Sequence, residues 1–360
     1  RDSSTSRGLG DVYKRQVKDL PKIKTVRRID WDDDLPSLPQ GKIAVFIGSH
    51  QQFDEKSTQA IDAFCANHNA VVFCDHTSGY KGEFRQIDAL LTKQNAECLN
   101  DIKLLIHLGE ISGDHFNMGD KAAEVWRVNR DGQMRDRYGK LTHLFAMSEK
   151  HFFERYKDKD IQPGISFLNQ CRTEYTRCYA AIPELPLSNI WMAKELAPSL
   201  PENSVFHLGI LTSLRSWDFF EVSKSIHSAC NVGGFGTDGM LSSLLGASII
   251  HPQKLYFGIV GDLAFFYDMN ALWNTNLGPN LRILLLNNGG GEIFHTLPGL
   301  EMSGTSHKFI TAVHKTSARG WAEERGFLYQ KVEDEVQLEE AMAMFTQPEP
   351  MTHPVLVEVF

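Results

Sequence analysis

The sequence predicts an α/β protein with two doubly wound parallel-sheet domains, and three observations support this fold class. Apolar segments of strand length recur along the chain, amphipathic helical patterns separate them, and a polar or glycine-containing loop follows each apolar segment. With 360 residues and 42% hydrophobic content, the chain is long enough to bury about two cores. We expect a first domain over residues 17–183 and a second over residues 184–360.

The first domain is expected to alternate strands and helices. Apolar segments predict strands at residues 43–50, 70–78, 102–110, 124–129 and 140–147. Helical spacing is found at residues 54–67, near 84–93 and at 148–157. Residues 1–16 are polar and unpatterned, so we treat them as a non-native segment. Charge and proline interrupt the pattern at 157–164 and 182–186, which places the domain boundary near residue 184.

The second domain repeats this rhythm. Strands are expected at residues 204–210, 255–260, 281–286 and 355–360, and helices at residues 189–196, 240–250 and 268–273. No internal repeat or low-complexity segment interrupts it.

Composition excludes several functional classes. The net charge of -8 and the lack of a long basic run argue against a nucleic-acid-binding protein. The six cysteines show no paired spacing, which argues against a disulfide framework or a zinc site and favours the cytoplasm. No apolar run approaches the roughly 18 residues that span a bilayer, so no membrane contact is expected. The histidines, His314 among them, are not at metal-ligand spacing, and we expect them to be structural or solvent-facing.

A glycine motif at residues 234–239 suggests one possible ligand. It reads G-x-G-x-x-G, and such a turn before a helix lets backbone N–H groups approach phosphates. Asp262 lies 23 residues beyond Gly239, where a dinucleotide-binding fold places the acid that contacts ribose. The motif alone is therefore compatible with a nicotinamide or flavin enzyme, although an isolated motif of this kind is more often an ordinary helix-entry turn.

A second pattern, Gly261-Asp262 and then Asn287-Asn288 followed by three glycines, indicates a different ligand. Asp262 and Asn288 are 26 residues apart, and each follows an apolar segment. One helix and one strand would return the chain so that both emerge at the carboxyl edge of the sheet, where open α/β sheets bind ligands. Carboxylate, amide and backbone carbonyl oxygens are the donors that Mg²⁺ prefers. The pair therefore predicts a magnesium diphosphate site, although Asp262 alone fits a helix N-cap and Asn-Asn alone fits a polar turn.

This spacing resembles the signature of the thiamine-diphosphate-dependent enzymes. Within that family, the segment GDLAFFYDMNAL and the later NLRILLLNNGGGEIFHTLPG resemble the branch that acts in menaquinone biosynthesis, with Leu263 after Gly-Asp. The resemblance is specific over residues 185–360, which makes residues 184–360 the C-terminal diphosphate-binding domain and residues 17–183 the middle domain. It also implies that an N-terminal pyrimidine-binding domain, which carries the activating glutamate, is missing. We therefore assign no catalytic residue and expect the isolated chain to be inactive.

The resemblance implies roles for individual residues. Contacts with thiamine diphosphate are expected from Gly236, Thr237, Asp238, Gly239, Asp262, Leu263, Ile293 and Phe294. Asp262, Asn288 and the carbonyl of Gly290 would hold Mg²⁺ or Mn²⁺, and Arg215 would bind a substrate carboxylate through its planar fork. The chain departs from the family pattern at three positions. Val232 stands where an arginine is expected, Thr237 where an aliphatic residue is expected, and Leu211 where a serine is expected.

The activity that the resemblance implies is decarboxylation of 2-oxoglutarate and addition of the succinyl unit to isochorismate. The full-length protein is expected to be a cytoplasmic homodimer or homotetramer that binds these small molecules, and neither nucleic acid nor membrane. Three alternatives stay open at this point: another thiamine-dependent 2-oxoacid decarboxylase or synthase, a nicotinamide-dependent oxidoreductase, and a non-catalytic binding module.

Overall fold

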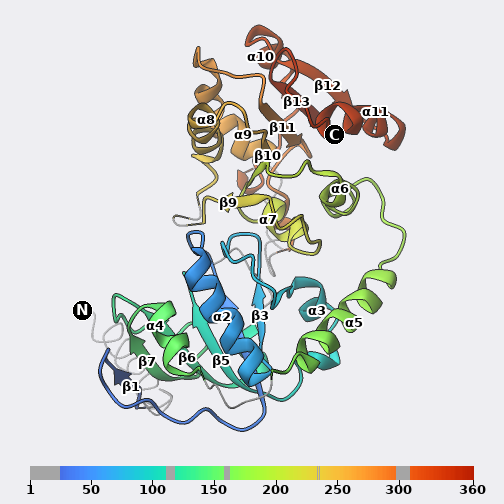
Figure 1. The fold of residues 1–360 in the computed structure, drawn as a ribbon. Coiled ribbons are helices and arrows are strands. Elements are labelled where there is room, and N and C mark those ends of the chain that lie inside the picture. The colour runs from blue at the N-terminus through green and yellow to red at the C-terminus, as the bar shows by residue number, and fades with distance from the viewer. Residues whose placement is uncertain (1–24, 111–117, 158–162, 233, 235, 297–308) are drawn as a thin grey trace, which may run out of the picture.

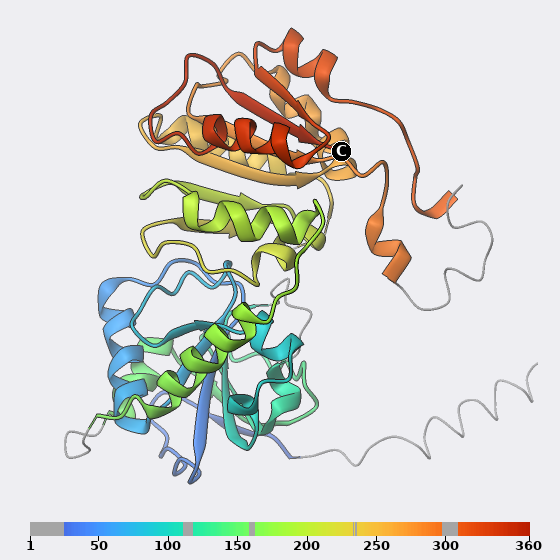
Figure 2. The same cartoon turned by 90° about the vertical axis from the view of Figure 1, so that its right-hand side faces the viewer.

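The computed structural model describes residues 25–110, 118–157, 163–232, 234, 236–296 and 309–360, and it confirms the α/β fold class. Its named strands form one sheet of seven strands and one of six. Within each sheet, all neighbouring strands run parallel. The two sheets lie one above the other in Figure 1, and Figure 2 shows the chain that leaves α5 (Ser166–Ala180) running between them to α6 (Asn189–Leu196). The boundary near residue 184 stays a prediction.

The first sheet has the strand order β1-β7-β6-β5-β2-β3-β4. Its strands are β1 (Arg27–Ile29), β2 (Lys42–Ile47), β3 (Val71–Cys74), β4 (Arg85–Ile87), β5 (Ile102–Leu108), β6 (Ala122–Asn129) and β7 (Leu141–Ala146). Its helices are α2 (Glu55–His68), α3 (Ala89–Lys93), α4 (Glu149–Arg155) and α5, with short 3₁₀ turns at Glu97–Leu99 and Met118–Lys121. The central strands β2, β3 and β5 consist mostly of buried apolar residues because helices cover a parallel sheet on both faces.

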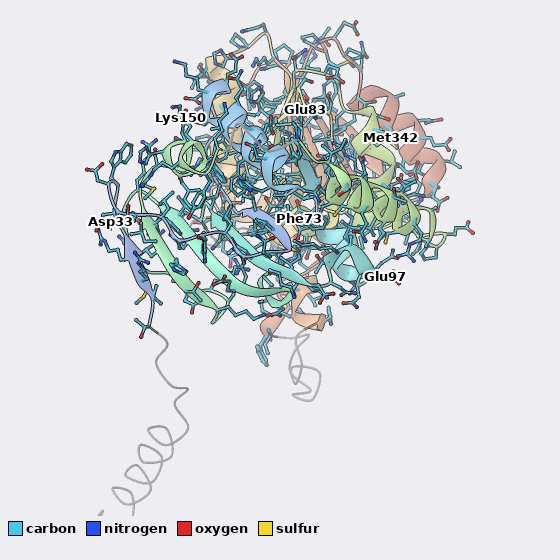
Figure 3. The ribbon with its side chains drawn as sticks, turned by 60° about the horizontal axis from the view of Figure 1, so that its bottom comes forward. Asp33, Phe73, Glu83, Glu97, Lys150 and Met342 are labelled. Atoms are coloured by element: carbon cyan, nitrogen blue, oxygen red, sulfur yellow. The ribbon has the colours of Figure 1, made fainter. Side chains whose placement is uncertain are left out.

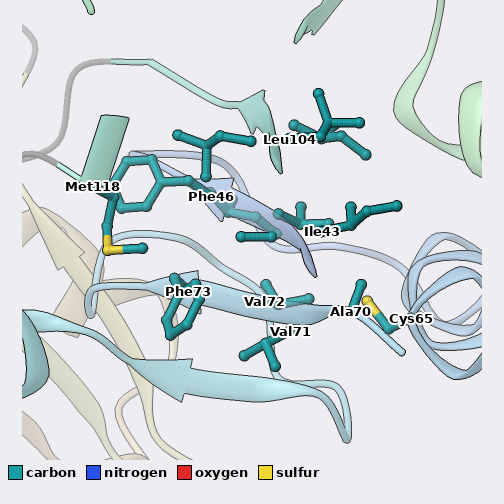
Figure 4. Packing of buried hydrophobic residues seen from close by; sticks show 14 of the residues in the cluster. Ile43, Phe46, Cys65, Ala70, Val71, Val72, Phe73, Leu104 and Met118 are labelled. Carbon is teal, nitrogen blue, oxygen red and sulfur yellow. The ribbon is translucent and has the colours of Figure 1, made fainter. Parts of the chain in front are cut away.

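Figure 4 shows part of this core, where Phe46 of β2 and Phe73 of β3 lie among buried aliphatic side chains and Met118. The predicted helix near residues 84–93 is partly wrong, because Arg85–Ile87 forms the edge strand β4. The Arg85 side chain is buried and donates from Nη1 to the Tyr80 carbonyl oxygen at 3.0 Å. A buried charged residue does not produce the apolar pattern by which strands are recognised, so β4 was missed.

The second sheet has the order β12-β13-β11-β10-β8-β9. Its strands are β8 (Val205–Leu208), β9 (His227–Cys230), β10 (Tyr256–Gly261), β11 (Leu281–Leu286), β12 (Leu328–Val332) and β13 (Val355–Val359). Its helices are α6, α7 (Thr212–Trp217), α8 (Met240–Ile250), α9 (Asp262–Asp268), α10 (Arg319–Glu324) and α11 (Glu335–Phe345), with 3₁₀ turns at Ala197–Ser199, Met269–Trp273 and Glu292–Thr296.

Alternation along the strands explains how this second sheet is covered on both faces. Phe257 and Ile259 of β10 pack with apolar residues of α6, α7 and α11, whereas Tyr256 and Val260 pack with residues of α8, α9 and α10. Successive side chains of a strand point to opposite faces, so one apolar strand supplies both cores. None of the helices that the structure describes is long and apolar enough to cross a membrane.

Polar contacts, one of them fully buried, connect the two halves of the chain. His76, which follows β3, has its Nε2 3.0 Å from the carbonyl oxygens of both Trp217 and Phe220. Arg85 of β4 pairs with Glu221 through Nε and Oε2 at 2.9 Å. Glu83, labelled in Figure 3, pairs with Lys224 at 3.0 Å, but both side chains are exposed and such pairs contribute little.

The buried His76 predicts acid destabilisation. Burial lowers the pKa of His76 from 6.5 to about 4, so the folded protein binds this proton only near pH 4 while the unfolded chain binds it near pH 6.5. The contribution to stability is therefore complete above pH 6.5 and is lost as the pH falls towards 4, by about 3 kcal/mol in total. Urea unfolding measures the free energy of unfolding at pH 7.5 and at pH 5. The difference between these two free energies should be smaller for His76→Gln than for the unmodified chain.

The matched control for this comparison is His353→Gln, because His353 is exposed. That variant should keep the full pH dependence of the unmodified chain. An unchanged pH dependence in His76→Gln would contradict the prediction.

Candidate functional site

The candidate site lies where the second sheet reverses the direction in which strands are added. From β8 the chain adds β9 on one side, then crosses back through α8 to add β10 on the other side of β8. At such a switch point the loops that follow neighbouring strands diverge and leave a crevice at the carboxyl edge of the sheet. The loops after β8, β10 and β11 meet here.

A cavity of about 160 Å³ occupies this position. Residues 209–213 after β8, residues 261–264 after β10, and residues 286, 288, 290 and 291 after β11 line it. Thr237, Ile293 and Phe294 complete the lining together with Asn189 of α6. Seven residues predicted from the sequence therefore come together in one cavity, namely Thr237, Asp262, Leu263, Asn288, Gly290, Ile293 and Phe294.

Three groups that carry oxygen donors meet at the cavity, namely the Asp262 carboxylate, the Asn288 amide and the Gly290 carbonyl. β10 and β11 are paired with Gly261 opposite Leu286, so Asp262 and Asn288 leave adjacent strand ends. One end of the Asn288 amide lies 2.8 Å from the Gly290 carbonyl oxygen and 3.1 Å from Oδ2 of Asp262, and without a cation this end is the nitrogen, which donates to both oxygens. A half-turn of the amide brings its oxygen to the same position.

These spacings fit a bound divalent cation. With Mg²⁺–oxygen distances of 2.0–2.1 Å, adjacent ligands of an octahedron are about 3 Å apart. When the Asn288 amide turns its oxygen towards the other two groups, all three oxygens can face one cation. The set of one carboxylate, one amide and one carbonyl is thus a hard-oxygen set that suits Mg²⁺ or Mn²⁺, with phosphate oxygens supplying the remaining positions.

The Asp262 carboxylate is buried, with 3% of the residue exposed, and its orientation is well defined. Oδ1 accepts from the Leu263 N–H at 2.6 Å, and Oδ2 accepts from the Gly290 N–H at 2.8 Å. A buried carboxylate needs such donors, because losing the water that surrounds it is costly. The same contact places Gly290 beside Asp262, so the strand-end acid and the glycine loop form one unit.

Glycine is needed in this loop for two separate reasons. Gly289 has a φ of 78°, in the left-handed region that other residues adopt at a cost. A Cβ on Gly290 would lie 2.8 Å from the Thr311 carbonyl oxygen, which is backbone and cannot move aside easily. Residues 311–314 therefore pack directly against the loop formed by residues 289–291.

Other predicted residues lie outside the cavity lining. Gly236, Asp238 and Gly239 belong to the turn before α8, where the Asn231 side chain donates from Nδ2 to the carbonyl oxygens of Gly236 at 2.8 Å and Asp238 at 3.0 Å. Arg215 is half-buried on α7, past the cavity-lining residues 211–213. Their roles in binding stay predictions.

The glycine motif does not have the surroundings of a dinucleotide site. It follows β9, which is the edge strand, and the acid expected to contact ribose follows β10. β10 pairs with β8 and β11, not with β9. A dinucleotide fold has this acid at the end of the strand next to the motif, so the arrangement argues against the nicotinamide hypothesis.

Sequence reasoning missed two features of the site. Leu211, which lines the cavity, has a φ of 69°, a strained conformation for a residue that is not glycine. His314 was expected to be structural or solvent-facing, but its Nε2 lies 3.1 Å from Oδ2 of Asp262. Leu211 is a departure from the family pattern, but nothing in the sequence indicates its backbone conformation. His314 belongs to no motif and is 52 residues from its partner.

A larger cavity of about 790 Å³ lies between the two sheets. It is lined by Ser49, His50, Gln51, Gly109, Glu110, residues 127–131 and Glu149 from the first sheet, and by Cys230 and Val232 from the second. Arg127 is buried here and pairs with Glu110 at 3.3 Å. Val232, one of the departures from the family pattern, therefore presents an apolar side chain to this space.

Comparison with known proteins confirms the resemblance seen in the sequence. The chain is 51% identical over 243 residues to the 2-succinyl-5-enolpyruvyl-6-hydroxy-3-cyclohexene-1-carboxylate synthase of Bacteroides thetaiotaomicron, a match that covers 66% of this chain and 42% of that protein. The synthase of the same name from Bacteroides fragilis is 50% identical over 245 residues, with the same coverage.

The similarity also extends into the first sheet. The synthase of that name from Flavobacterium johnsoniae is 24% identical over 364 residues, which covers 96% of this chain and 64% of the relative. The chain thus spans 42% of the length of the two Bacteroides relatives in their matched regions, and less than two thirds of the Flavobacterium one. No family model matches the chain.

Proposed function

From this similarity and the site, we propose that the chain is the metal- and diphosphate-binding part of a thiamine-diphosphate-dependent enzyme of menaquinone biosynthesis. The proposed reaction is decarboxylation of 2-oxoglutarate followed by addition of the succinyl unit to isochorismate, in the cytoplasm and in a homodimer or homotetramer. The observation that carries the proposal is the meeting of three groups with oxygen donors, Asp262, Asn288 and Gly290, at the switch point of the second sheet.

Each group in the cavity has a task that follows from its chemistry. Asp262, Asn288 and Gly290 would hold the cation, whose charge balances a diphosphate. When bound, thiamine diphosphate supplies the nucleophilic carbon and the electron sink for decarboxylation. Ile293 and Phe294 line the same cavity with apolar surface, which keeps water from the reacting atoms and strengthens the charged contacts beside it.

The substrates carry carboxylates, so their binding calls for cations near the cavity. Arg215 on α7 is our candidate, since guanidinium binds a carboxylate through two parallel hydrogen bonds. The loop after β8 connects this helix to the cavity through Leu211, Thr212 and Ser213.

Calorimetric titration of this chain with thiamine diphosphate tests the proposal. Binding should require Mg²⁺, and removing the metal should weaken it by roughly 30-fold or more, the factor that corresponds to losing about 2 kcal/mol of charged contact. NADH serves as the control ligand and should not bind. Binding of NADH in place of thiamine diphosphate would overturn the proposal in favour of an oxidoreductase.

A further inference from the structure

The His314 ring contacts the proposed metal site through one defined tautomer. Its Nδ1 accepts a hydrogen bond from the Thr316 N–H at 3.1 Å, and its Nε2 lies 3.1 Å from Oδ2 of Asp262. A nitrogen that accepts from a backbone N–H carries no proton, so the neutral ring has its hydrogen on Nε2. That hydrogen points at the carboxylate.

The ring is also held in place by packing. Its side chain is 17% exposed, and the Phe266 ring of α9 meets it edge-on with ring centroids 5.3 Å apart. Because Phe266 and Asp262 belong to the same helix, the histidine lies against two successive turns of α9. Its position is thereby fixed relative to the carboxylate.

The backbone of the same segment holds the glycine loop. The His314 N–H donates to the Gly289 carbonyl oxygen at 3.0 Å, and the Gly291 N–H donates to the Thr311 carbonyl oxygen at 2.7 Å. These two bonds flank Gly290, whose carbonyl is one of the three groups that meet at the cavity. One short segment therefore contacts both the carboxylate and the carbonyl of the proposed metal site.

We propose that His314 is a positioning residue of this metal site, which holds the Asp262 carboxylate through Nε2–H while its backbone holds the Gly289–Gly291 loop. This inference rests on the proposed function, because it requires that a cation binds at Asp262. Partners that hydrogen-bond to metal ligands fix the orientation of those ligands, and losing such a partner typically weakens metal binding 10- to 100-fold. His314 does not touch the cation itself.

The test measures Mn²⁺ binding by electron paramagnetic resonance in the presence of thiamine diphosphate. His314→Ala should raise the Kd for Mn²⁺ by about 10- to 100-fold. His314→Gln places an N–H donor near the position of Nε2 and should restore most of the affinity. His251→Ala, which removes an exposed histidine at the end of α8, is the matched control and should bind as the unmodified chain does.

The outcomes separate this inference from the proposed function. If the unmodified chain binds no Mn²⁺ with thiamine diphosphate, the proposed function fails. If it binds and His314→Ala binds equally well or more tightly, the positioning role is refuted. Thermal unfolding without metal shows whether each variant folds. If His314→Ala does not fold, His314→Gln and His314→Leu are compared instead. An Mn²⁺ affinity equal to that of the unmodified chain in His314→Gln, and a lower one in His314→Leu, would support the role of the N–H donor.

Discussion

Replacing Asp262 with alanine is expected to abolish metal-dependent binding of thiamine diphosphate at practical concentrations. The substitution removes the only carboxylate among the three groups that meet at the cavity. Losing a buried charged contact costs roughly 2 to 5 kcal/mol, which corresponds to a loss of about 30-fold to several thousand-fold in affinity. Calorimetry with Mg²⁺ and thiamine diphosphate measures this loss directly.

Two further variants make the Asp262 result specific. Asp262→Asn keeps an oxygen in place but removes its charge, so its affinity should fall between that of alanine and that of the unmodified chain. Glu339→Ala removes a carboxylate from the exposed face of α11 and should leave binding unchanged. Undiminished binding by a folded Asp262→Ala would show that the cation is held elsewhere.

The largest loss of stability is expected at Glu358 of β13, which is fully buried. Its Oε1 accepts from Nδ2 of Asn287 at 2.7 Å and from the Ala318 N–H at 2.9 Å, and its Oε2 accepts from the hydroxyls of Ser317 and Tyr329, both at 2.7 Å. Burial, followed by the contact with the carboxylate, raises the pKa of Tyr329, so its hydroxyl remains a donor. All four donors depend on this one side chain.

Glu358→Leu should lower the free energy of unfolding by about 3 to 5 kcal/mol, because it removes the acceptor of two buried donors, Nδ2 of Asn287 and the Ala318 N–H, and that of the half-buried Tyr329 hydroxyl. Urea unfolding at pH 7.5 measures the change. Glu358→Gln is the isosteric control, since its oxygen still accepts from two donors and the hydroxyls can rotate to accept from its amide; it should cost less than half as much. Similar losses for both variants would mean that shape, not hydrogen bonding, determines the effect.

The Glu358 network also connects stability to the site. Asn287 immediately precedes Asn288, and its side chain is anchored by Glu358 and by the Thr316 carbonyl oxygen at 2.8 Å. Loosening this anchor changes where Asn288 points. If Glu358→Leu remains folded, it should therefore bind Mn²⁺ in the presence of thiamine diphosphate less tightly than Glu358→Gln does.

Local patterns were enough to predict much of the fold. The strands that became β2, β5, β10 and β11 were expected from continuous apolar segments, and the helices α2 and α8 from their spacing. Elements with weak patterns were missed, among them β9, whose four residues alternate between exposed and half-buried, and the helix α5 beyond the interrupted stretch. An edge strand buries little apolar surface, so its sequence carries little signal.

The sequence by itself determined the fold class and the two residues at the centre of the site. Asp262 and Asn288 could be paired from spacing because parallel strands with one crossover bring their carboxyl ends to the same edge. Only the tertiary structure decided that Asn189 and Leu211 share their cavity, that His314 contacts Asp262, and that Glu358 holds Asn287. Those contacts join segments with no fixed spacing along the chain, and they exist only once long-range packing has selected which loops meet.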